Sequence, residues 1–190
     1  TGSTNLADIG TTLAGQHPGN HSALLLAGVA MLLVGFAFKV SLVPFHAWTP
    51  DVYQGAPTPI TALMGSVGKV AAFAALLRVF TVALPSRADD WGPLVLVLAV
   101  ATLLVGSVLA VIQTDVKRML AYSSISHAGF ILVGLEAASH ISNADSSLGV
   151  SSAMAYLFVY GVLVVGTLAV VSFIAGKGDN ATTLGAFNGL

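Results

Sequence analysis

The stretch "GFAFKVSLVPFHAWTPDVYQGAPTPI", Gly35 to Ile60, decides the fold because it joins two long apolar segments and interrupts a helix between them. It carries four of the chain's seven prolines, and Pro44 follows Lys39 by five residues. A proline inside a helix removes a backbone donor and clashes with the preceding turn, so Pro44 and Pro50 are both predicted to interrupt the helix. Since "VPFHAW" is still apolar, two interpretations stay open. The chain remains at membrane depth through a broken helix, or the helix ends at the interface with Trp48 as an aromatic anchor.

The composition indicates that lipid, not water, surrounds most of this chain. Hydrophobic residues make up 56% of the 190 residues, charged residues make up 8%, and the mean hydropathy is +0.90. A soluble domain usually has about 25% charged residues. The net charge of -1 argues against nucleic acid as a partner. The absence of cysteine excludes disulfides, thiolate metal sites and cysteine nucleophiles. With its few histidines scattered, the chain is predicted to bind no metal and no redox cofactor.

Five apolar runs predict an all-α membrane protein with about five transmembrane helices. Each run is near the roughly 20 residues that a spanning helix needs, and none shows the alternation of a barrel strand. The predicted spans cover residues 23–43, extended through a helix broken at Pro44, and residues 60–84, 94–112, 119–138 and 150–175. "PSRADDWGP" and "QTDVKR" are predicted as separators between spans. The first twenty residues lack a signal-peptide pattern. Residues 1–190 are therefore interpreted as a single transmembrane segment of a larger subunit.

The basic residues predict the orientation. Lys117, Arg118 and Lys177 belong to one side, whereas Arg87 and Arg78 belong to the other. Under the positive-inside rule the Lys117 side is cytoplasmic. The N-terminus is then expected outside and the C-terminus in the cytoplasm.

Two lysines inside apolar runs are the first candidate functional residues. A lysine at the bilayer centre costs about 2.5–3.5 kcal/mol, so each should face protein or water. Lys39 could instead snorkel to the interface, but Lys69 is roughly ten residues from either end of its span. The face of Lys69 is mostly small, which permits close helix packing or leaves room for water. It comprises Ala62, Gly65, Ser66, Ala72 and Phe73. Because the proton affinity of a buried lysine changes readily with its surroundings, Lys69 could relay protons.

Other polar residues give weaker signals. His127, in "YSSISHAGF", is either a third relay residue or a structural histidine between helices. Glu136 is expected at the membrane interface, and the turn with Asp115, Lys117 and Arg118 is interpreted as solvated. His46 either acts in proton transfer or binds freed backbone groups in the break.

Three motifs resemble the antiporter-like membrane subunits of respiratory complex I, the NADH:quinone oxidoreductase. They are "FKVSLVPFHAWTPDVYQGAPTPI", "GKVAAF" and "QTDVKRMLAYSSISHAGF". The likeness covers nearly the whole chain, and the spacing Lys-x-x-x-x-Pro-Phe-His-x-Trp-x-Pro-Asp is highly specific. The continuation "VYQGAPTP" favours the subunit N branch of this family.

The resemblance implies a fourteen-helix fold with inverted repeats and a line of ionisable residues across the membrane. It implies that Lys39 is the lysine of a discontinuous helix, that Lys69 is the lysine of the next helix, and that His127 faces the second half-channel. A glutamate partner of Lys39 and a second broken-helix lysine are expected outside this chain.

The resulting hypothesis is proton translocation in a bacterial inner or plasma membrane, as a subunit of a proton-translocating NADH:quinone oxidoreductase. The expected partners are the other membrane subunits of complex I and the lipid bilayer. NADH and quinone would be used by the whole complex, with no cofactor bound by this chain. The alternatives are a cation/proton antiporter or membrane-bound hydrogenase subunit, and a structural membrane subunit that conducts nothing.

Overall fold

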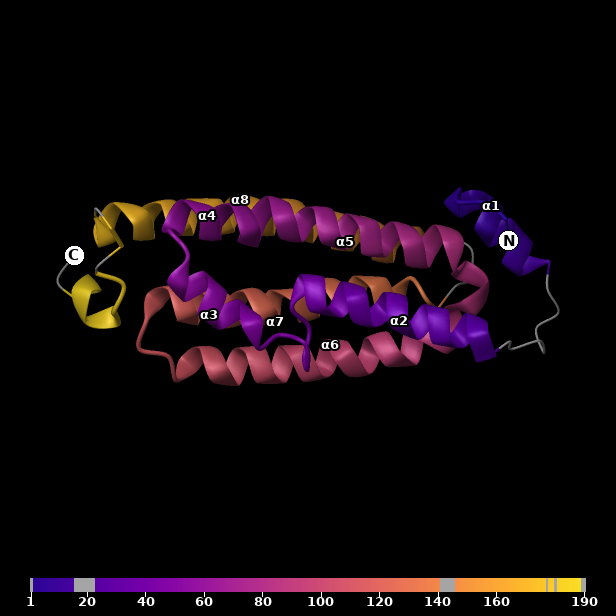
Figure 1. Ribbon diagram of the computed structural model, residues 1–190, viewed down its shortest axis with the longest axis horizontal. Coiled ribbons are helices and arrows are strands. Elements are labelled where there is room, and N and C mark those ends of the chain that lie inside the picture. The colour runs from indigo at the N-terminus through magenta and orange to yellow at the C-terminus, as the bar shows by residue number, and fades with distance from the viewer. Residues whose placement is uncertain (1, 16–22, 141–145, 177, 180, 189–190) are drawn as a thin grey trace.

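The computed structural model describes residues 2–15, 23–140, 146–176, 178–179 and 181–188 as an elongated bundle of helices. Lys177, used above for orientation, lies outside the described residues. Figure 1 places the N-terminus at one end of the bundle and the C-terminus at the other. Five helical segments in the described part are long and apolar enough to cross a membrane: Ala23–Val40, Thr58–Ala83, Pro85–Val111, Val116–Ala137 and Ser147–Ala175. The predicted fold class is therefore confirmed.

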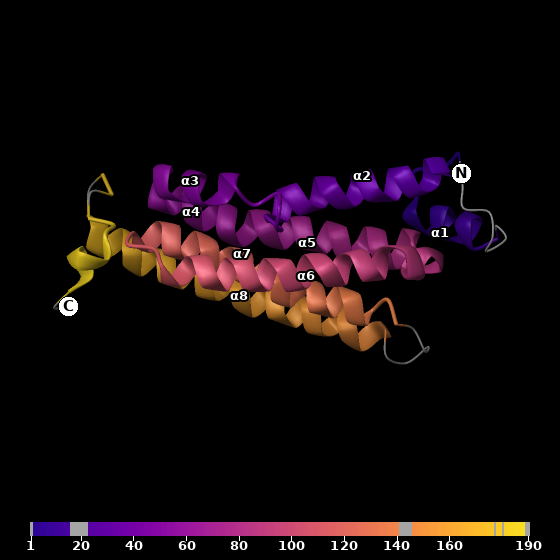
Figure 2. The same ribbon diagram turned by 90° about the horizontal axis from the view of Figure 1, so that it is seen from below.

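The helix break at Pro44 is present, and its first residues are buried in the bundle. Helix α2 (Ala23–Val40) ends before it, and α3 (Trp48–Gly55) begins after it. The two helices run nearly end to end in both views (Figures 1 and 2). Ser41 and Leu42, in the connection, are fully buried. The connection thus starts inside the bundle, whereas Pro44 itself is exposed on this chain.

Pro50 plays a different part from the one that its position in the proline-rich stretch suggested. It is the third residue of α3, where a backbone amide has no partner within the helix. A proline in the first turn is tolerated for this reason and fixes a suitable φ. Pro50 therefore begins a helix, and Pro44 alone belongs to the break.

The second span is one continuous rod made of four pieces. These are α4 (Thr58–Leu63), a π-helical turn (Met64–Gly68), α5 (Lys69–Arg78) and a second π-helical turn (Val79–Ala83). A π turn holds an extra residue and commonly marks a functional region of a helix. Here the first π turn leads directly into Lys69.

The remaining spans complete the bundle. A short 3₁₀ turn (Pro85–Arg87) precedes α6 (Ala88–Val111), which is followed by α7 (Val116–Ala137) and α8 (Ser146–Ala175). Helix α1 (Leu6–Ala14) packs at the N-terminal end, and a 3₁₀ turn (Leu184–Phe187) lies at the C-terminal end. Figure 2 shows α2 and α3 on one side, α8 on the other, and α5, α6 and α7 between them.

Helix α6 begins six residues before its predicted start because the separator "PSRADDWGP" is largely helical. Asp89 and Asp90 lie in its first turn, where carboxylates stabilise the positive end of the helix dipole. Trp91 is buried, and its indole donates a hydrogen bond to the Leu84 carbonyl at 2.9 Å. The apparent loop is therefore part of the packed end of the bundle.

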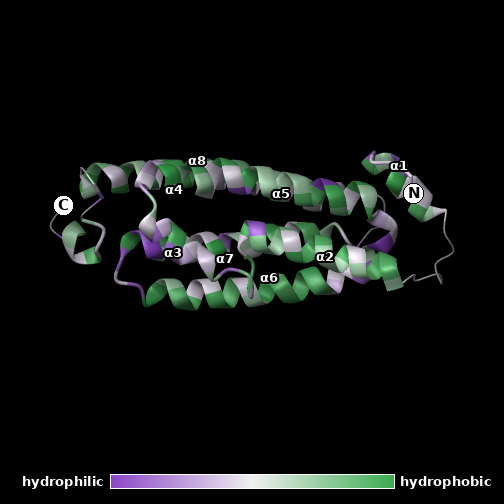
Figure 3. Cartoon of the chain, viewed as in Figure 1, coloured by the Kyte–Doolittle hydropathy of each residue, from purple (hydrophilic) through white to green (hydrophobic). Residues whose placement is uncertain are grey.

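The outer surface is apolar, as a lipid-facing surface should be. Phe173 is 89% exposed and Leu104 is 62% exposed, and both are on spanning helices. Figure 3 shows that hydrophobic residues occur along most of the length of the long helices. In lipid such exposure costs nothing, so the distinguishing feature of this chain is its few buried polar groups.

Candidate functional site

Lys69 is the central buried cation of the bundle. Its side chain is 3% exposed, and its ammonium donates to Ser124 twice, at 2.7 Å to the carbonyl and 2.5 Å to the hydroxyl. Ser124 is on α7, so this contact joins the second and fourth spans. The small face around Lys69 packs inward as predicted: Gly65, Ser66, Ala72 and Phe73 are buried. Close helix packing and a buried lysine therefore occur together here.

His127 lies one turn beyond Ser124 on the same helix. Its Nδ1 is 2.7 Å from the Tyr156 hydroxyl of α8, and its ring centroid is 5.0 Å from that of Tyr160. The hydroxyl can either donate to Nδ1 or accept from it, depending on the imidazole tautomer. His127 is half-buried, so one side of the ring faces the inner part of the bundle.

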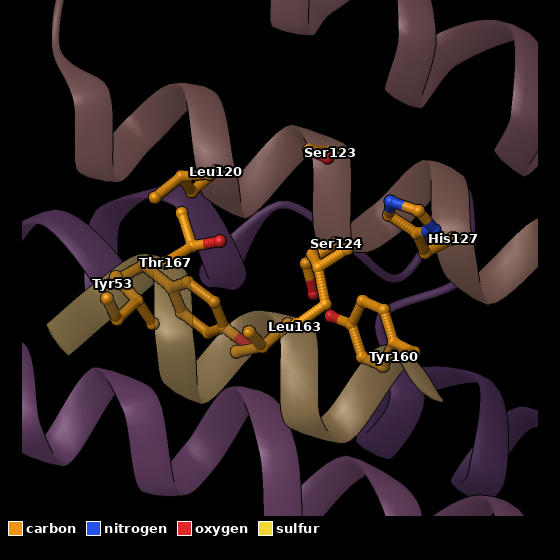
Figure 4. A pocket seen from close by; sticks show the side chains of 10 residues that line it. Tyr53, Leu120, Ser123, Ser124, His127, Tyr160, Leu163 and Thr167 are labelled. Atoms are coloured by element: carbon orange, nitrogen blue, oxygen red, sulfur yellow. The ribbon is translucent and has the colours of Figure 1, made fainter. Parts of the chain in front are cut away.

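A small cavity of about 30 Å³ lies between these residues and α8. This volume is enough for about one water molecule. Figure 4 shows the Ser124 and Tyr160 side chains turned toward each other beside His127. Among the described residues the buried Tyr160 hydroxyl has no hydrogen-bond partner. We call this the inner cavity; its lining is Tyr53, Leu120, Ser123, Ser124, His127, Tyr160, Leu163, Val164, Thr167 and Leu168.

The hydroxyls around the inner cavity were not among the predicted site residues. Tyr156 and Tyr160 are four residues apart in the otherwise apolar "AYLFVYG", and Ser124 lies three residues before His127. Those spacings place each pair on one helix face and are the signal that could have identified them. Tyr53, inside the proline-rich stretch, gave no such signal.

Lys39 lies where the helix break was predicted to place it, in the last turn of α2. Its side chain is exposed on this chain and makes no hydrogen bond or ion pair with the described residues. The nearby Phe38 carbonyl already accepts from the Trp48 indole at 3.1 Å and from the Ser41 amide at 3.2 Å. The structure therefore brings Lys69 and His127 to one site and leaves Lys39 on the uncovered face of α2.

The break itself is held by neutral hydrogen bonds. The Val43 amide donates to the Thr102 hydroxyl of α6 at 3.1 Å, and the Thr49 hydroxyl donates to that of Ser41 at 2.6 Å. His46 is half-buried, and its Nδ1 has no partner among the described residues. The interpretation that His46 binds freed backbone groups through this nitrogen is thus not supported.

The turn before α7 is packed, which corrects the interpretation of a solvated turn. Lys117 is 1% exposed and Asp115 is 8% exposed. Asp115 caps α7 by accepting from the Arg118 amide at 2.9 Å, and it also accepts from the Thr182 hydroxyl at 2.6 Å. A local charge run looked solvated because the returning C-terminal segment that covers it is more than sixty residues away in sequence.

Two further charged contacts lie near the ends of α7. Arg118 forms an ion pair with Asp51 of α3 at 2.5 Å, and Glu136 contacts His140 at 2.5 Å. Glu136 is half-buried near the C-terminal end of α7, and its expected position at the membrane interface stays a prediction.

The comparisons with known proteins agree with this arrangement. The family described as "NADH:quinone oxidoreductase/Mrp antiporter, TM" matches residues 1–190. The chain belongs to this family of antiporter-like transmembrane proteins.

Among curated relatives, the chain is 52% identical over 170 residues to NADH-quinone oxidoreductase subunit N 3 of Streptomyces griseus subsp. griseus, covering 90% of this chain and 29% of the relative. The likeness to subunit N that "VYQGAPTP" predicted is confirmed. The chain spans about a third of the length of the curated relatives that it matches.

Two solved structures share the fold. One is respiratory complex I from Thermus thermophilus with bound aureothin, at 35% identity and a TM-score of 0.65, over 89% of this chain and 36% of that one. The other is the archaeal membrane-bound sulfane sulfur reductase, at 25% identity and a TM-score of 0.81, over 98% of this chain and 36% of that one.

Proposed function

We propose that this chain is part of a proton-translocating subunit in the membrane arm of an NADH:quinone oxidoreductase. Subunit N relatives at about half identity support this proposal, as does the shared fold with a complex I structure. NADH oxidation and quinone reduction would take place in other subunits and would drive the proton movement. The other membrane subunits of that complex and the surrounding lipid are the proposed partners.

The observation that carries the proposal is that the buried Lys69 ammonium donates a hydrogen bond to the Ser124 hydroxyl, beside a cavity the size of a water molecule. The Lys69 ammonium, the Ser124 hydroxyl and the His127 imidazole can each exchange or transmit a proton. A water molecule in the inner cavity would be within reach of Ser124 and His127, because both line it. A proton leaving Lys69 could therefore move through Ser124 or a water molecule to His127.

The proposed sequence of carriers is Lys39, Lys69 and His127. Lys39 would be paired with a carboxylate outside this chain, since its side chain lies on a face that the described helices leave uncovered. The proposed orientation places the Lys117 end of the bundle in the cytoplasm and the N-terminus outside, in a bacterial inner or plasma membrane. Lys39 is then the carrier nearest the break, and Lys69 and His127 form the next stage.

Replacing Lys39 with alanine tests this function against a purely structural role. A relay predicts normal assembly of the complex, with NADH-driven proton pumping and coupled quinone reduction falling by about tenfold or more. The measurement is acidification of inverted membrane vesicles, with the amount of assembled complex determined on native gels. Normal pumping with reduced assembly would instead indicate a scaffold that conducts nothing.

Removing the Tyr156 hydroxyl tests the role of His127. In Tyr156→Phe the 2.7 Å contact to Nδ1 is lost while the ring remains in place. Since one hydrogen bond contributes about 1 kcal/mol, we expect pumping to fall by about fivefold and the pH profile of pumping to shift. Phe130 also packs against the imidazole, at 6.4 Å between centroids, so Phe130→Leu is a control that keeps the hydrogen bond. An unchanged pH profile in Tyr156→Phe would assign the contact to packing alone.

A further inference from the structure

Lys117 is the second fully buried lysine of the described chain, and its surroundings differ from those of Lys69. Its ammonium donates to the Ala56 carbonyl at 2.5 Å and lies 3.4 Å from the Asp179 carboxylate. Ala56 is in the turn between α3 and α4, and Asp179 follows α8. One side chain thus joins three parts of the bundle at its C-terminal end.

Asp179 is held in place from a second direction. Its carboxylate accepts from the Thr58 amide at 2.6 Å, at the first residue of α4. Burial alone would raise the pKa of Asp179. The hydrogen bond from Thr58 and the positive charge of Lys117 together have a larger effect in the opposite direction, so the pKa of Asp179 lies below its ordinary value. The carboxylate is therefore ionised at neutral pH and forms a charge-assisted contact with Lys117.

A cavity of about 430 Å³ lies at this contact. We call it the outer cavity because it lies nearer to the end of the bundle than the inner cavity does; the name does not refer to a side of the membrane. Its lining includes the polar side chains of Gln54, Lys117, Ser172 and Asp179, together with Gly55 and Gly176. This volume has room for several water molecules, and the polar lining can hydrogen-bond them.

The outer and inner cavities are lined by consecutive turns of the same three elements. On α7, Lys117 and Ser124 are seven residues apart, which places them on one face with a rise of about 10 Å. On α8, Ser172 follows Leu168 by one turn, and Gly55 follows Tyr53 closely on α3. The two cavities share no lining residue. Leu120 and Leu168 are the apolar residues of the inner cavity nearest to the outer one along these helices.

We propose that the Lys117–Asp179 ion pair is a gate that controls the access of water from the outer cavity to the inner cavity. In the closed state, Lys117 holds the turn before α4 and the segment after α8 together across the start of α7. Opening separates the ammonium from Asp179 while the Ala56 carbonyl remains its acceptor. Water then passes Leu120 and Leu168 to reach Ser124 and His127. The use of this water for proton transfer rests on the proposed function, whereas the gate itself does not.

The test measures water access directly, with cysteines as reporters. The 190-residue chain contains no cysteine, so a single introduced thiol can be followed by peptide mass spectrometry. Thr167→Cys reports the inner cavity and Ser172→Cys reports the outer cavity. Each is placed in the assembled complex in membrane vesicles and treated with a charged methanethiosulfonate reagent that does not cross lipid. The quantity compared is the labelling rate at residue 167 divided by the rate at residue 172.

Asp179→Asn is expected to raise this ratio by about fivefold, which corresponds to about 1 kcal/mol of lost closed-state preference. The amide keeps an acceptor for the Thr58 N–H, so the segment after α8 stays attached. Lys117→Met, which removes both contacts of the ammonium, is expected to raise the ratio as well and serves if Asp179→Asn fails to assemble. A change in charge alters the local concentration of the charged reagent at both positions, because residue 172 lies in the outer cavity beside Lys117 and Asp179. This effect therefore cancels in the ratio of the two labelling rates.

Thr182→Ala is the matched control. It removes the 2.6 Å contact with Asp115, which also fastens the C-terminal segment but does not line the outer cavity. An unchanged ratio in both Asp179→Asn and Lys117→Met would overturn the gate, and so would an equal rise in Thr182→Ala. Labelling needs no turnover, so a gate can be confirmed even if Lys69 carries no protons. Failure of the proposed function appears separately, as undiminished pumping by Lys69 variants.

Discussion

Lys69→Ala is expected to lower NADH-driven proton pumping by at least about a hundredfold, with coupled quinone reduction reduced and the complex still assembled. The Lys69 side chain is 3% exposed, and both hydrogen bonds of its ammonium go to Ser124. Serine carries no charge, so Ser124 cannot take over the role of the ammonium as a proton donor. Alanine is small like the residues around it, and the bundle should therefore fold. The measurement is the rate of vesicle acidification per assembled complex.

Two further variants separate proton transfer from the presence of a charge. Lys69→Arg keeps the cation but does not release a proton in a protein, so a relay predicts that it fails almost as badly as alanine. If the charge only holds α5 against α7, arginine should restore much of the activity. Arg78→Ala removes an exposed cation nine residues along the same helix and should pump normally. Pumping at the parent rate in Lys69→Ala would contradict the assignment.

Gly106→Ala is expected to cause a large loss of folded subunit. A Cβ at this position would lie 2.6 Å from the backbone nitrogen of Ser126, a separation that real Cβ atoms do not adopt. Helices α6 and α7 would have to move apart, at a cost of about 1–3 kcal/mol or more. The expected result is at least about a fivefold drop in assembled subunit, measured on native gels and by thermal stability in detergent.

The control for this prediction is Gly166→Ala on α8. Nothing lies within 4 Å of a Cβ built there, so alanine should be neutral or should stabilise the helix by about 0.5–1 kcal/mol. The two substitutions are chemically identical and differ only in what the added methyl meets. If Gly106→Ala is as stable as Gly166→Ala, then α6 and α7 are less closely packed than the structure indicates.

The sequence was sufficient for the number of long apolar helices, the helix break and the buried position of Lys69. Apolar runs, a proline in a helix and the small face around Lys69 can all be recognised from residues that are close together in the chain. What it could not supply were contacts between distant residues. The partner of Lys69 is fifty-five residues away, and the Asp179 partner of Lys117 is sixty-two residues away.

Two residues show how local patterns misled. Lys117 belongs to a charged turn that looks solvated, and only the returning segment after α8 makes it a buried residue. Pro50 counts as a breaker in any local reading, although its place in the first turn of α3 makes it compatible with a helix. The tyrosines of α8 could not be predicted as site residues because single hydroxyls on apolar helices are common. They indicate a site only when the structure shows that they face polar groups of another helix.

The hydroxyl lining of the inner cavity has a consequence for direction. Serine, threonine and tyrosine hydroxyls both donate and accept, and they turn to suit either role. The hydroxyls of Ser124, Thr167 and Tyr160, which all line the inner cavity, therefore impose no direction on a proton that moves among them. Under the proposed function, the direction of proton movement must therefore be set on either side of the inner cavity, and reversing the driving force should move protons through it the opposite way.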